Sequence, residues 1–324
     1  MSYAIKFHQT GGPEVLQREE IVVGDPGAGQ VRIRQEAVGL NFIDVYYRKG
    51  LYPTSLPSGL GTEGSGVVEA VGDDVYFLKP GDRVAYAGGP LGAYASERIM
   101  PADKLIKLPD DIGFDMAASM MLQGLTAEYL LRRTYPVKAG DNVLIHAAAG
   151  GVGQIALQWA KALGAFVVAT AGGPEKVALV KSLGADVVID YKVDDFVAAT
   201  REATKGAGVQ VVYDGVGKDT FMGSLDCLAP RGYMVSYGNA SGAVPAIEPL
   251  LLSQKGSLFL TRPTLGSYTS TRAELAEAAE ALFEIVLAGK VRVGASNRYP
   301  LADVALAHRD LEARKTTGSI ILVP

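Results

Sequence analysis

The sequence predicts an α/β protein in which a doubly wound parallel sheet is inserted into a mostly antiparallel β domain. Three observations predict this fold. The first third carries short alternating apolar segments between glycines and prolines, which is typical of antiparallel strands. The middle third alternates strand-length apolar runs with helical patterns, which indicates a parallel sheet with right-handed crossovers. The last segment ends in one isolated strand pattern at 319–323, and such a strand needs a sheet to join.

Because the β-rich first segment is the natural host for that strand, we expect the chain to return to its first domain. Residues 1–122 and 265–324 would then form the β domain, and residues 123–264 the inserted domain. The clearest strands of the first part are 30–37, 66–71 and 83–86, with a turn at Lys79-Pro80-Gly81-Asp82.

The elements of the inserted domain follow one another at regular spacing. Helices are predicted at 123–133, at 152–163 and from Pro174 to Gly184, with proline in the first turn. Strands are predicted at 142–146, 166–170, 187–190, 209–213 and 233–237. Beyond 265, Thr271-x-x-Glu274 is typical of a capping box before a helix that ends at Gly289, and a second helix is expected at 301–313.

The most informative stretch is Val143-Leu144-Ile145 leading into Gly151-x-Gly153-x-x-Ala156 and an amphipathic helix. The order of strand, glycine turn and helix lets backbone amides approach a pyrophosphate and directs the positive end of the helix dipole at it. The alternative is an ordinary strand-to-helix turn. We expect a dinucleotide to bind here.

The loop after the next strand indicates which dinucleotide. NAD-specific sites place a carboxylate about 20 residues beyond the glycine turn, where it holds the ribose hydroxyls. Here that position falls in Thr170-Ala171-Gly172-Gly173, which has no acid, and Lys176 follows one turn into the next helix. Lys176 taken alone is better explained as a solvated helix lysine. The acid-free loop with a nearby cation, and Tyr191 as a hydroxyl donor, favours the 2′-phosphate of NADP(H).

Composition excludes several other classes of protein. The formal net charge is −4 and no basic run stands out, so a dedicated nucleic-acid binder is not expected. Cys227 is the one cysteine, which excludes a disulfide framework and a thiolate metal cluster. The apolar stretch at 143–163 is broken by glycines, His146 and Gln154, and the first residues are too polar for a signal peptide, so we expect neither a membrane span nor export. The expected location is the cytoplasm.

Several motifs together resemble one family. They are Asn41-Phe42-Ile43-Asp44-Val45-Tyr46, Gly61-Thr62-Glu63-Gly64, Leu122-Gln123-Gly124-Leu125-Thr126-Ala127, Ala147-Ala148-Ala149-Gly150-Gly151-Val152-Gly153, Val212-Tyr213-Asp214-Gly215-Val216-Gly217, Ser236-Tyr237-Gly238-Asn239 and Thr317-Gly318-Ser319. From end to end the chain resembles the zinc-free quinone oxidoreductases, the zeta-crystallin branch of the medium-chain dehydrogenase/reductases. The resemblance implies a GroES-like β domain, a Rossmann domain, NADPH as hydride donor, and a homodimer paired through the Rossmann sheets.

The same resemblance addresses the metal. Zinc-containing relatives have a cysteine where this chain has Asn41 and a His-Glu pair where it has Thr62-Glu63, and they carry four further cysteines. With one cysteine and the separated His8, His146 and His308, which we expect to be structural, neither tetrahedral site can form. Without a Lewis acid to stabilise an alkoxide, quinones or activated alkenes are the expected acceptors.

The resemblance also assigns site residues. The nicotinamide and substrate site would be lined by Asn41, Asp44, Tyr46, Tyr52, Gln123 and Thr126. The cofactor would be held by Asn41, Tyr129, Gly150, Gly151, Val152, Gly172, Gly173, Lys176, Tyr191, Val216, Gly238, Asn239 and Arg314. Each has a structural alternative: the tyrosines as packing residues, and Asp44 and Glu63 as carboxylates that accept from backbone amides.

Three functions remain open at this point. The first is NADPH-dependent reduction of a small quinone or similar activated acceptor. The second is reduction of an enone or alkenal, with the same cofactor and an activated C=C bond as hydride acceptor. The third, from a different class, is a crystallin-type structural role or binding of AU-rich RNA, which the acidic net charge disfavours.

Overall fold

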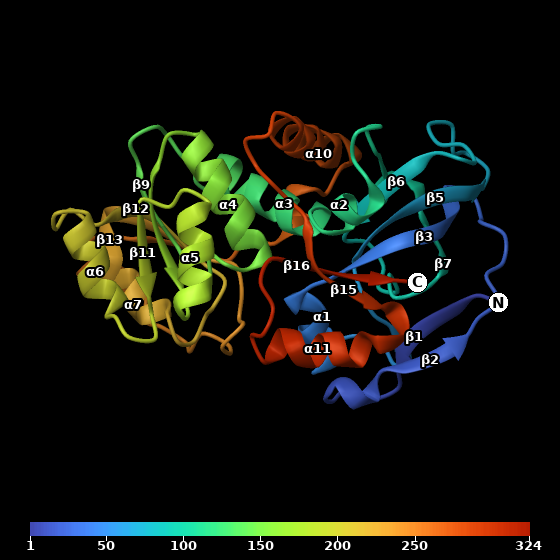
Figure 1. The fold of residues 1–324 in the computed structure, drawn as a ribbon, viewed down its shortest axis with the longest axis horizontal. Helices are drawn as coiled ribbons and strands as arrows, with labels where there is room; N and C mark the ends of the chain where they lie inside the picture. The colour runs from blue at the N-terminus through green and yellow to red at the C-terminus, as the bar shows by residue number, and fades with distance from the viewer. The chain divides into compact units, whose positions relative to one another are not determined.

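The computed structural model describes residues 1–324, and they divide into two compact units (Figure 1). The first unit comprises Met1–Leu125, Thr269–Phe283 and Val293–Pro324, and the second comprises Thr126–Tyr268 and Glu284–Arg292. The second unit is therefore inserted into the chain of the first, which confirms the predicted class of fold.

The first unit is built on a seven-stranded sheet and a three-stranded sheet, in which all pairs but one are antiparallel. The large sheet has the order β15-β16-β3-β5-β6-β8, with β7 also paired to β3, and the small one the order β2-β1-β4. The strands are β1 (Tyr3–Phe7), β2 (Gln17–Glu20), β3 (Gln30–Leu40), β4 (Ser58–Gly59), β5 (Glu63–Val71), β6 (Arg83–Ala87), β7 (Glu97–Pro101), β8 (Ile106–Lys107), β15 (Ala295–Pro300) and β16 (Ser319–Val323).

The long strand β3 organises the core of this unit. Its side chains alternate between buried and partly exposed positions, and Val31 and Ile33 are fully buried beside Phe7 and Leu60. The terminal strand β16 pairs antiparallel with β3, so the isolated strand pattern does join the first domain as predicted. Burial of this apolar face gives the sheet a fixed register.

Short helices close the first unit. They are α1 (Phe42–Arg48), α2 (Phe114–Ala118) and α11 (Val304–Glu312), with 3-10 turns at Pro13–Val15, Ala102–Lys104 and Leu301–Asp303. Helix α10 (Arg272–Leu287) begins with the predicted capping box: the Thr271 hydroxyl accepts from the Glu274 amide at 3.2 Å, and the Glu274 carboxylate accepts from the Thr271 amide at 2.9 Å.

The second unit is a six-stranded parallel sheet with helices on both faces (Figure 1). Its strand order is β11-β10-β9-β12-β13-β14. The strands are β9 (Asn142–Ile145), β10 (Phe166–Ala171), β11 (Val187–Asp190), β12 (Val209–Asp214), β13 (Leu228–Ser236) and β14 (Phe259–Thr261). The helices are α3 (Met121–Tyr129), which begins in the first unit, α4 (Gly151–Ala162), α5 (Pro174–Ser182), α6 (Phe196–Ala203), α7 (Phe221–Cys227), α8 (Leu250–Gln254) and α9 (Leu265–Tyr268).

The strand order reverses between β9 and β12, because the chain first builds outward from β9 to β11 and then restarts on the other side. Ligands of doubly wound sheets bind at the carboxyl ends of the strands beside such a reversal. Helices α4 and α5 lie on one face of the sheet and α6 and α7 on the other (Figure 1). Trp159 of α4 and Cys227 of α7 are buried in this unit.

Some elements differ from the prediction. The helix expected over 123–133 ends at Tyr129 and continues as a π-helical turn, Leu130–Thr134, which is wider than an α-helical turn. Tyr213 Oη donates to the Leu130 carbonyl in this turn at 3.0 Å. Helices α1 and α6 and strands β14 and β15 were not predicted. None of the helices is long and apolar enough to cross a membrane.

Candidate cofactor and active site

The glycine turn between β9 and α4 has the geometry that its sequence requires. A Cβ on Gly153 would lie 2.5 Å from the Ala147 carbonyl oxygen and 2.7 Å from the Ala148 Cα, so no larger residue fits. Gly150 is the extended N-cap residue of α4, and Ala147 turns the chain with a positive φ of 51°. The first-turn amides of a helix have no intrahelical acceptor, which leaves them available to a phosphate. Predicted residues Gly150, Gly151 and Val152 all belong to this turn.

The loop after β10 forms the second part of the cofactor site. Gly173 has a φ of 91°, and Pro174 then begins α5, which carries Lys176 in its first turn. A Cβ on Gly172 would lie 2.5 Å from the Tyr191 hydroxyl oxygen, so the Tyr191 ring packs directly on this loop. The structure thus brings together Gly172, Gly173 and Tyr191, and places Lys176 on the helix that follows.

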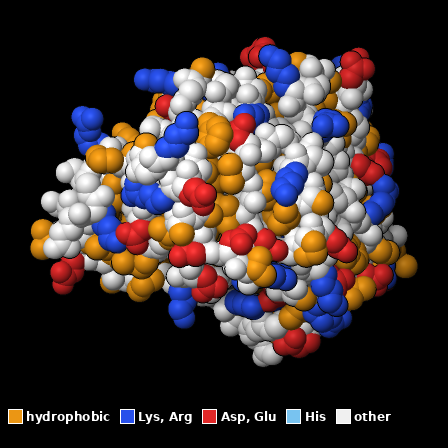
Figure 2. All heavy atoms as spheres, turned by 60° about the vertical axis from the view of Figure 1, so that its left-hand side comes forward, with side chains coloured by type: hydrophobic (Ala, Val, Ile, Leu, Met, Phe, Trp, Pro, Cys, Tyr) orange, Lys and Arg blue, Asp and Glu red, His pale blue; other side chains and the backbone are white.

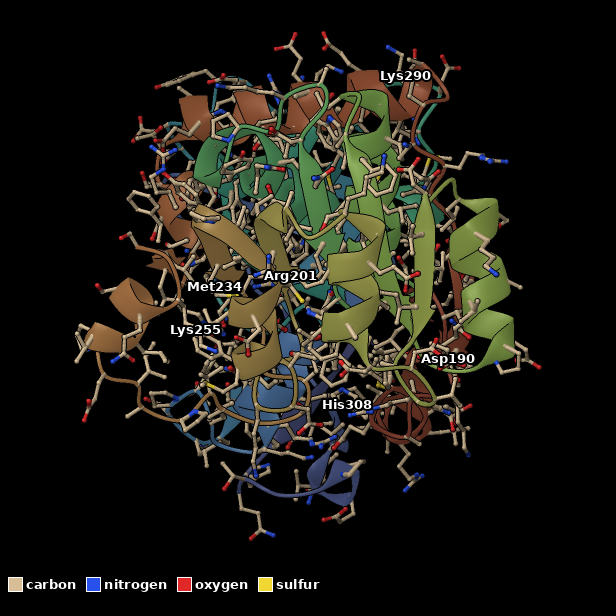
Figure 3. The ribbon with its side chains drawn as sticks, turned by 90° about the vertical axis from the view of Figure 1, so that its left-hand side faces the viewer. Asp190, Arg201, Met234, Lys255, Lys290 and His308 are labelled. Carbon is tan, nitrogen blue, oxygen red and sulfur yellow. The ribbon has the colours of Figure 1, made fainter.

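Sequence counting missed Asp190, which lies at the carboxyl end of β11 (Figure 3). Its Oδ1 accepts from the amide of Gly173 at 3.0 Å and from that of Lys192 at 3.1 Å. These two bonds lower the pKa of the Asp190 carboxyl. Asp190 belongs to the neighbouring strand, not to the loop after β10, and its Oδ1 is bonded to backbone amides. The signal that could have found it is an acidic residue at the end of a predicted strand.

Asp214 organises the third part of the site, at the end of β12. Its Oδ1 accepts from the amides of Val216 at 2.7 Å and Gly217 at 3.0 Å. The loop after β13 packs against this turn, since a Cβ on Gly238 would lie 2.3 Å from the Gly215 carbonyl oxygen. Predicted residues Val216, Gly238 and Asn239 therefore lie on two loops in contact beside the strand reversal.

A buried histidine links two of these strand ends. His146 Nδ1 lies 3.0 Å from the Thr170 hydroxyl on β10, and Nε2 lies 3.0 Å from the Ser224 hydroxyl on α7. Thr220 donates at 2.8 Å to the second carboxylate oxygen of Asp214. Burial lowers the pKa of His146, which favours the neutral ring. His146 is structural, as predicted.

In the first unit, Asn41 is the centre of a buried hydrogen-bond network. It is the N-cap of α1 and is 5% exposed. Its amide nitrogen donates to Glu63 Oε2 at 2.7 Å, and its amide oxygen accepts from Gln123 Nε2 at 3.1 Å. Its backbone N–H donates to Asp44 Oδ2 at 2.9 Å. The structure therefore brings together three predicted residues, Asn41, Asp44 and Gln123, and adds Glu63.

The carboxyl groups of Asp44 and Glu63 both accept hydrogen bonds from backbone amides, which agrees with the alternative that they are structural. Glu63 Oε1 accepts from the Leu122 amide at 2.8 Å, and both side chains are fully buried. Burial raises the pKa of Asp44 to about 7 and that of Glu63 to about 8, since it penalises the charged form. Asp44 Oδ1 is buried without a hydrogen-bond partner.

A second chain of hydrogen bonds ends on Asp44, and sequence reasoning did not find it. The buried Arg48 donates to His308 Nδ1 at 2.9 Å, and its guanidinium also pairs with Glu312. Because arginine can only donate, the proton of His308 lies on Nε2, which then donates to the Tyr94 hydroxyl at 3.1 Å. Tyr94 in turn donates to Asp44 Oδ2 at 2.9 Å.

That chain fixes the protonation of His308. Burial and the nearby Arg48 lower its pKa to about 3, so the ring stays neutral and His308 is structural, as predicted.

The remaining predicted residues belong to different units. Tyr46 and Tyr52 lie in the first unit with their ring centroids 5.4 Å apart, edge to face. Arg314 also belongs to the first unit and follows α11 with a positive φ of 58°. Thr126 and Tyr129 belong to the second unit, where the Tyr129 ring stacks on Tyr268 at 4.6 Å.

The donor set at the zinc positions of related enzymes does not fit zinc. No group of three or more His, Cys, Asp or Glu side chains in the structure could hold a metal ion. Asn41 and Thr62 present an amide and a hydroxyl in place of a thiolate and an imidazole, and the Asn41 amide is already bonded to Glu63.

The surface carries charges of both signs. Figure 2 shows lysines and arginines interspersed with acidic side chains over the face that it displays, without a continuous basic stripe. This distribution matches the small net charge of −4.

Comparison with known proteins gives matches over both units. Residues 27–110 match the alcohol dehydrogenase GroES-like domain, and residues 151–284 match the domain described as zinc-binding dehydrogenase. The chain is 52% identical to a quinone oxidoreductase of Pseudomonas aeruginosa, with 100% of both chains covered. It is 46% identical to a 2-haloacrylate reductase of Burkholderia, with 100% of this chain and 99% of the relative covered.

A solved structure is also similar. The crystal structure of Escherichia coli quinone oxidoreductase complexed with NADPH matches with a TM-score of 0.98 at 50% identity, covering 99% of this chain and 100% of that one.

Proposed function

The chain belongs to the quinone oxidoreductase family of the medium-chain dehydrogenase/reductases, and from this premise we propose that it transfers a hydride from NADPH to a quinone without a metal ion. The observation that carries the proposal is the cofactor half-site of the second unit. It combines a phosphate-binding glycine turn with the loop at Gly172 and Gly173, Tyr191 packed on that loop, and Lys176 on the next helix. NADPH supplies the hydride when bound.

The chain's own residues position the cofactor. The amides of Gly151 and Val152 bind the pyrophosphate, and Gly150 shapes the turn, since its own N–H donates to the Ala147 carbonyl at 2.9 Å. Lys176 and Tyr191 bind the 2′-phosphate, to which the family resemblance adds Arg314. Val216, Gly238, Asn239 and Tyr129 complete the cofactor contacts. The hydrogen bonds of Asp190 to Gly173 and of Asp214 to Val216 support this proposal, because they fix the loops that carry these residues.

The residues around Asn41 orient the reacting groups. Asn41 positions the nicotinamide ring, and its own amide is held by Glu63 and Gln123. Tyr46 and Tyr52 bind the acceptor oxygen or supply the proton that a reduced quinone takes up, and the family resemblance adds Asp44 and Thr126 to the residues of this site. Orientation of this kind is the main catalytic contribution when the acceptor already takes hydride readily.

One observation favours a second candidate function. The 46% identical relative is named a 2-haloacrylate reductase, and such an acceptor is an activated alkene. Reduction of an activated C=C bond needs the same cofactor and the same hydride, so it is the alternative to quinone reduction.

An acceptor panel tests the proposal. NADPH oxidation would be followed with 1,4-benzoquinone, 9,10-phenanthrenequinone, an α,β-unsaturated ketone and 2-chloroacrylate. We expect the highest kcat/KM with a quinone. Turnover of an alkene with no turnover of either quinone would contradict the proposal and favour the alternative.

We further propose that the protein is a cytoplasmic homodimer. A free, buried Cys227 as the one cysteine suits a reducing compartment. Strand β14 is the last strand of its sheet and leaves Phe259 and Leu260 exposed, which supports pairing of two such sheets at this edge.

A further inference from the structure

Four buried polar side chains form one line in the first unit, from Glu63 through Asn41 and Gln123 to Ser319. Successive contacts are 2.7 Å from Glu63 Oε2 to Asn41 Nδ2, 3.1 Å from Asn41 Oδ1 to Gln123 Nε2, and 2.6 Å from Gln123 Oε1 to Ser319 Oγ. They come from β5, the start of α1, α3 and β16, so the line ties together four elements.

At Ser319 this chain of hydrogen bonds has two acceptors but one hydrogen to donate. Its hydroxyl lies 2.6 Å from Gln123 Oε1 and also 2.6 Å from the Ser119 carbonyl oxygen. Both atoms are acceptors, and a serine hydroxyl has a single hydrogen to donate. The Ser119 hydroxyl gives no help, because it donates to the Met116 carbonyl at 2.8 Å.

Turning both amides around resolves this conflict. Gln123 Nε2 then donates to Ser319 Oγ, which is free to donate to Ser119, and Asn41 Nδ2 donates to Gln123 Oε1. Asn41 Oδ1 now faces Glu63 Oε2, and two acceptors can meet there only if Glu63 carries a proton. Glu63 Oε1 keeps its bond from the Leu122 amide in both arrangements.

One further contact bears on the orientation of the Asn41 amide: in the capping box of α1 the Asn41 side chain faces the backbone N–H of Asp44, so reversal of the amide gives up that acceptor. The peptide N–H of Asp44 is bonded to the Asn41 main-chain oxygen at 3.0 Å, so it does not depend on the side-chain oxygen. The other hydrogen bonds of the Asn41 side chain are those to Glu63 and Gln123. The two arrangements differ by one proton and two amide rotations.

We propose that the protonation state of Glu63 determines the orientation of the side-chain amides of Asn41 and Gln123. Glu63 is then a positioning residue for hydride transfer. The proposal rests on the proposed function where it assigns Asn41 to the nicotinamide ring. In either orientation the Asn41 amide keeps one N–H and one oxygen lone pair outside the network. Rotation of the amide exchanges the positions of these two groups, so the cofactor meets a different hydrogen-bonding group in each protonation state of Glu63.

The surroundings of Glu63 favour the protonated state near neutral pH. A Cβ on Gly39 of β3 would lie 2.1 Å from Glu63 Oε2, so the carboxyl is pressed against backbone and excludes water. The titratable side chains that interact with it are Asp44 on α1, Tyr86 on β6 and Tyr94 beyond β6, and none is a cation. Burial, with a smaller contribution from Asp44, raises the pKa of Glu63 to about 8.

The variant Glu63→Gln tests this directly. The amide oxygen of the introduced glutamine would accept from the Leu122 amide, as Glu63 Oε1 does. The amide nitrogen of the introduced glutamine would take the place of Oε2 facing Asn41, where it can only donate. The variant is therefore fixed in the state that protonated Glu63 produces. Glu69→Gln on the same strand, where Glu69 pairs with Arg32 at the surface, is the matched control.

Two measurements are made on the full-length protein between pH 6 and pH 9.5. Infrared difference spectra of the free enzyme record the carbonyl stretch of protonated carboxylic acids, and steady-state kinetics record kcat/KM for NADPH with 1,4-benzoquinone. Asp44→Asn is included because Asp44 is the other buried carboxyl in the network and its pKa of about 7 lies close to that of Glu63.

We expect two carboxylic-acid bands. The Asp44 band disappears as pH rises through about 7 and is missing from Asp44→Asn. The Glu63 band disappears as pH rises through about 8, survives in Glu69→Gln and Asp44→Asn, and is missing from Glu63→Gln. Wild-type kcat/KM falls about tenfold over the same range, since one ligand hydrogen bond is misdirected. Glu63→Gln stays at the low-pH level of the wild type throughout.

The proposal is overturned if the band that titrates through about 8 persists in Glu63→Gln, or if kcat/KM of that variant keeps the wild-type pH dependence. If Glu63→Gln does not fold, the proposal is tested with Asp44→Asn: loss of the band that titrates through about 8 from this variant would assign the band to Asp44 and overturn the proposal. Absence of quinone turnover in the wild type would refute the proposed function, while the infrared titration would still decide the protonation of Glu63.

Discussion

Asp44 and Glu63 both use Asn41 as a hydrogen-bond partner, one through its backbone and the other through its side chain. Both are fully buried, and for both the cost of burying a charge outweighs the hydrogen bonds that favour the ionised form. Carboxyl groups with raised pKa values cluster at functional sites, although structural hydrogen-bond networks also raise the pKa of a buried carboxyl. Here the two groups flank the residue that we assign to the nicotinamide.

The raised pKa of Asp44 predicts how stability depends on pH. A carboxyl that keeps its proton in the folded protein after the unfolded chain has lost it makes stability fall as pH rises. For Asp44 this window runs from 3.8 to about 7. Within it the group contributes a slope of up to about 1.4 kcal/mol per pH unit.

In Asp44→Asn we therefore expect the free energy of unfolding to fall less between pH 5 and pH 7 than in the wild type. Urea titrations at pH 5, 6, 7 and 8 measure it, with the exposed Asp111→Asn as control. An unchanged slope in Asp44→Asn would show that Asp44 is ionised throughout.

Lys176 gives a second prediction at this scale. Lys176→Ala removes a cation from the first turn of α5, beside the loop that we assign to the 2′-phosphate. It should weaken NADPH binding by about 1.5–3 kcal/mol, roughly 10- to 100-fold, with little effect on NADH binding. Equilibrium titration with both cofactors measures the difference. Lys181→Ala, at the end of the same helix, is the control. Equal losses for the two cofactors would reject the assignment.

At the scale of elements, prediction succeeded where the signal is local. The glycine turn before α4, the proline that opens α5 and the capping box of α10 are each written in a few consecutive residues. Strand β15 was missed, because it is polar and its pairing with β16 depends on residues far along the chain. Helix α6 carried a usable signal: Asp195, the N-cap, accepts from the Val197 amide at 2.9 Å.

The polar networks were predicted less completely for the same reason. The line from Arg48 to Asp44 passes through His308, which is 260 residues from Arg48 in sequence. No motif joins two such positions, so only the fold reveals the contact. Asn41, Asp44 and Gln123 were found through a family resemblance rather than through their spacing.

The exposed edge strand β14 predicts an assembly. A lysine on an edge strand opposes pairing with another sheet, so Leu260→Lys should convert the expected dimer to a monomer with an unchanged circular dichroism spectrum. Size-exclusion chromatography with light scattering gives the mass. Leu306→Lys, at an exposed leucine of α11 in the other unit, should leave the mass unchanged. A dimeric Leu260→Lys protein would place the interface elsewhere.

For the whole molecule, the two units contribute different parts of the proposed reaction. The second unit carries the glycine turn and the loops fixed by Asp190 and Asp214, and the first carries the network around Asn41. The donor sets at Asn41 and Thr62 do not suit zinc, although the family that matches residues 151–284 is described as zinc-binding. We therefore propose that hydride transfer in this protein needs no metal ion.

The most direct test of that claim is a single-turnover measurement with NADPH carrying deuterium at one or the other C4 position, mixed with 1,4-benzoquinone after dialysis against a chelator. We predict that one of the two labels slows NADPH oxidation, that the other does not, and that chelation leaves the rate unchanged. Equal rates with both labels, or loss of the reaction on chelation, would contradict metal-free hydride transfer.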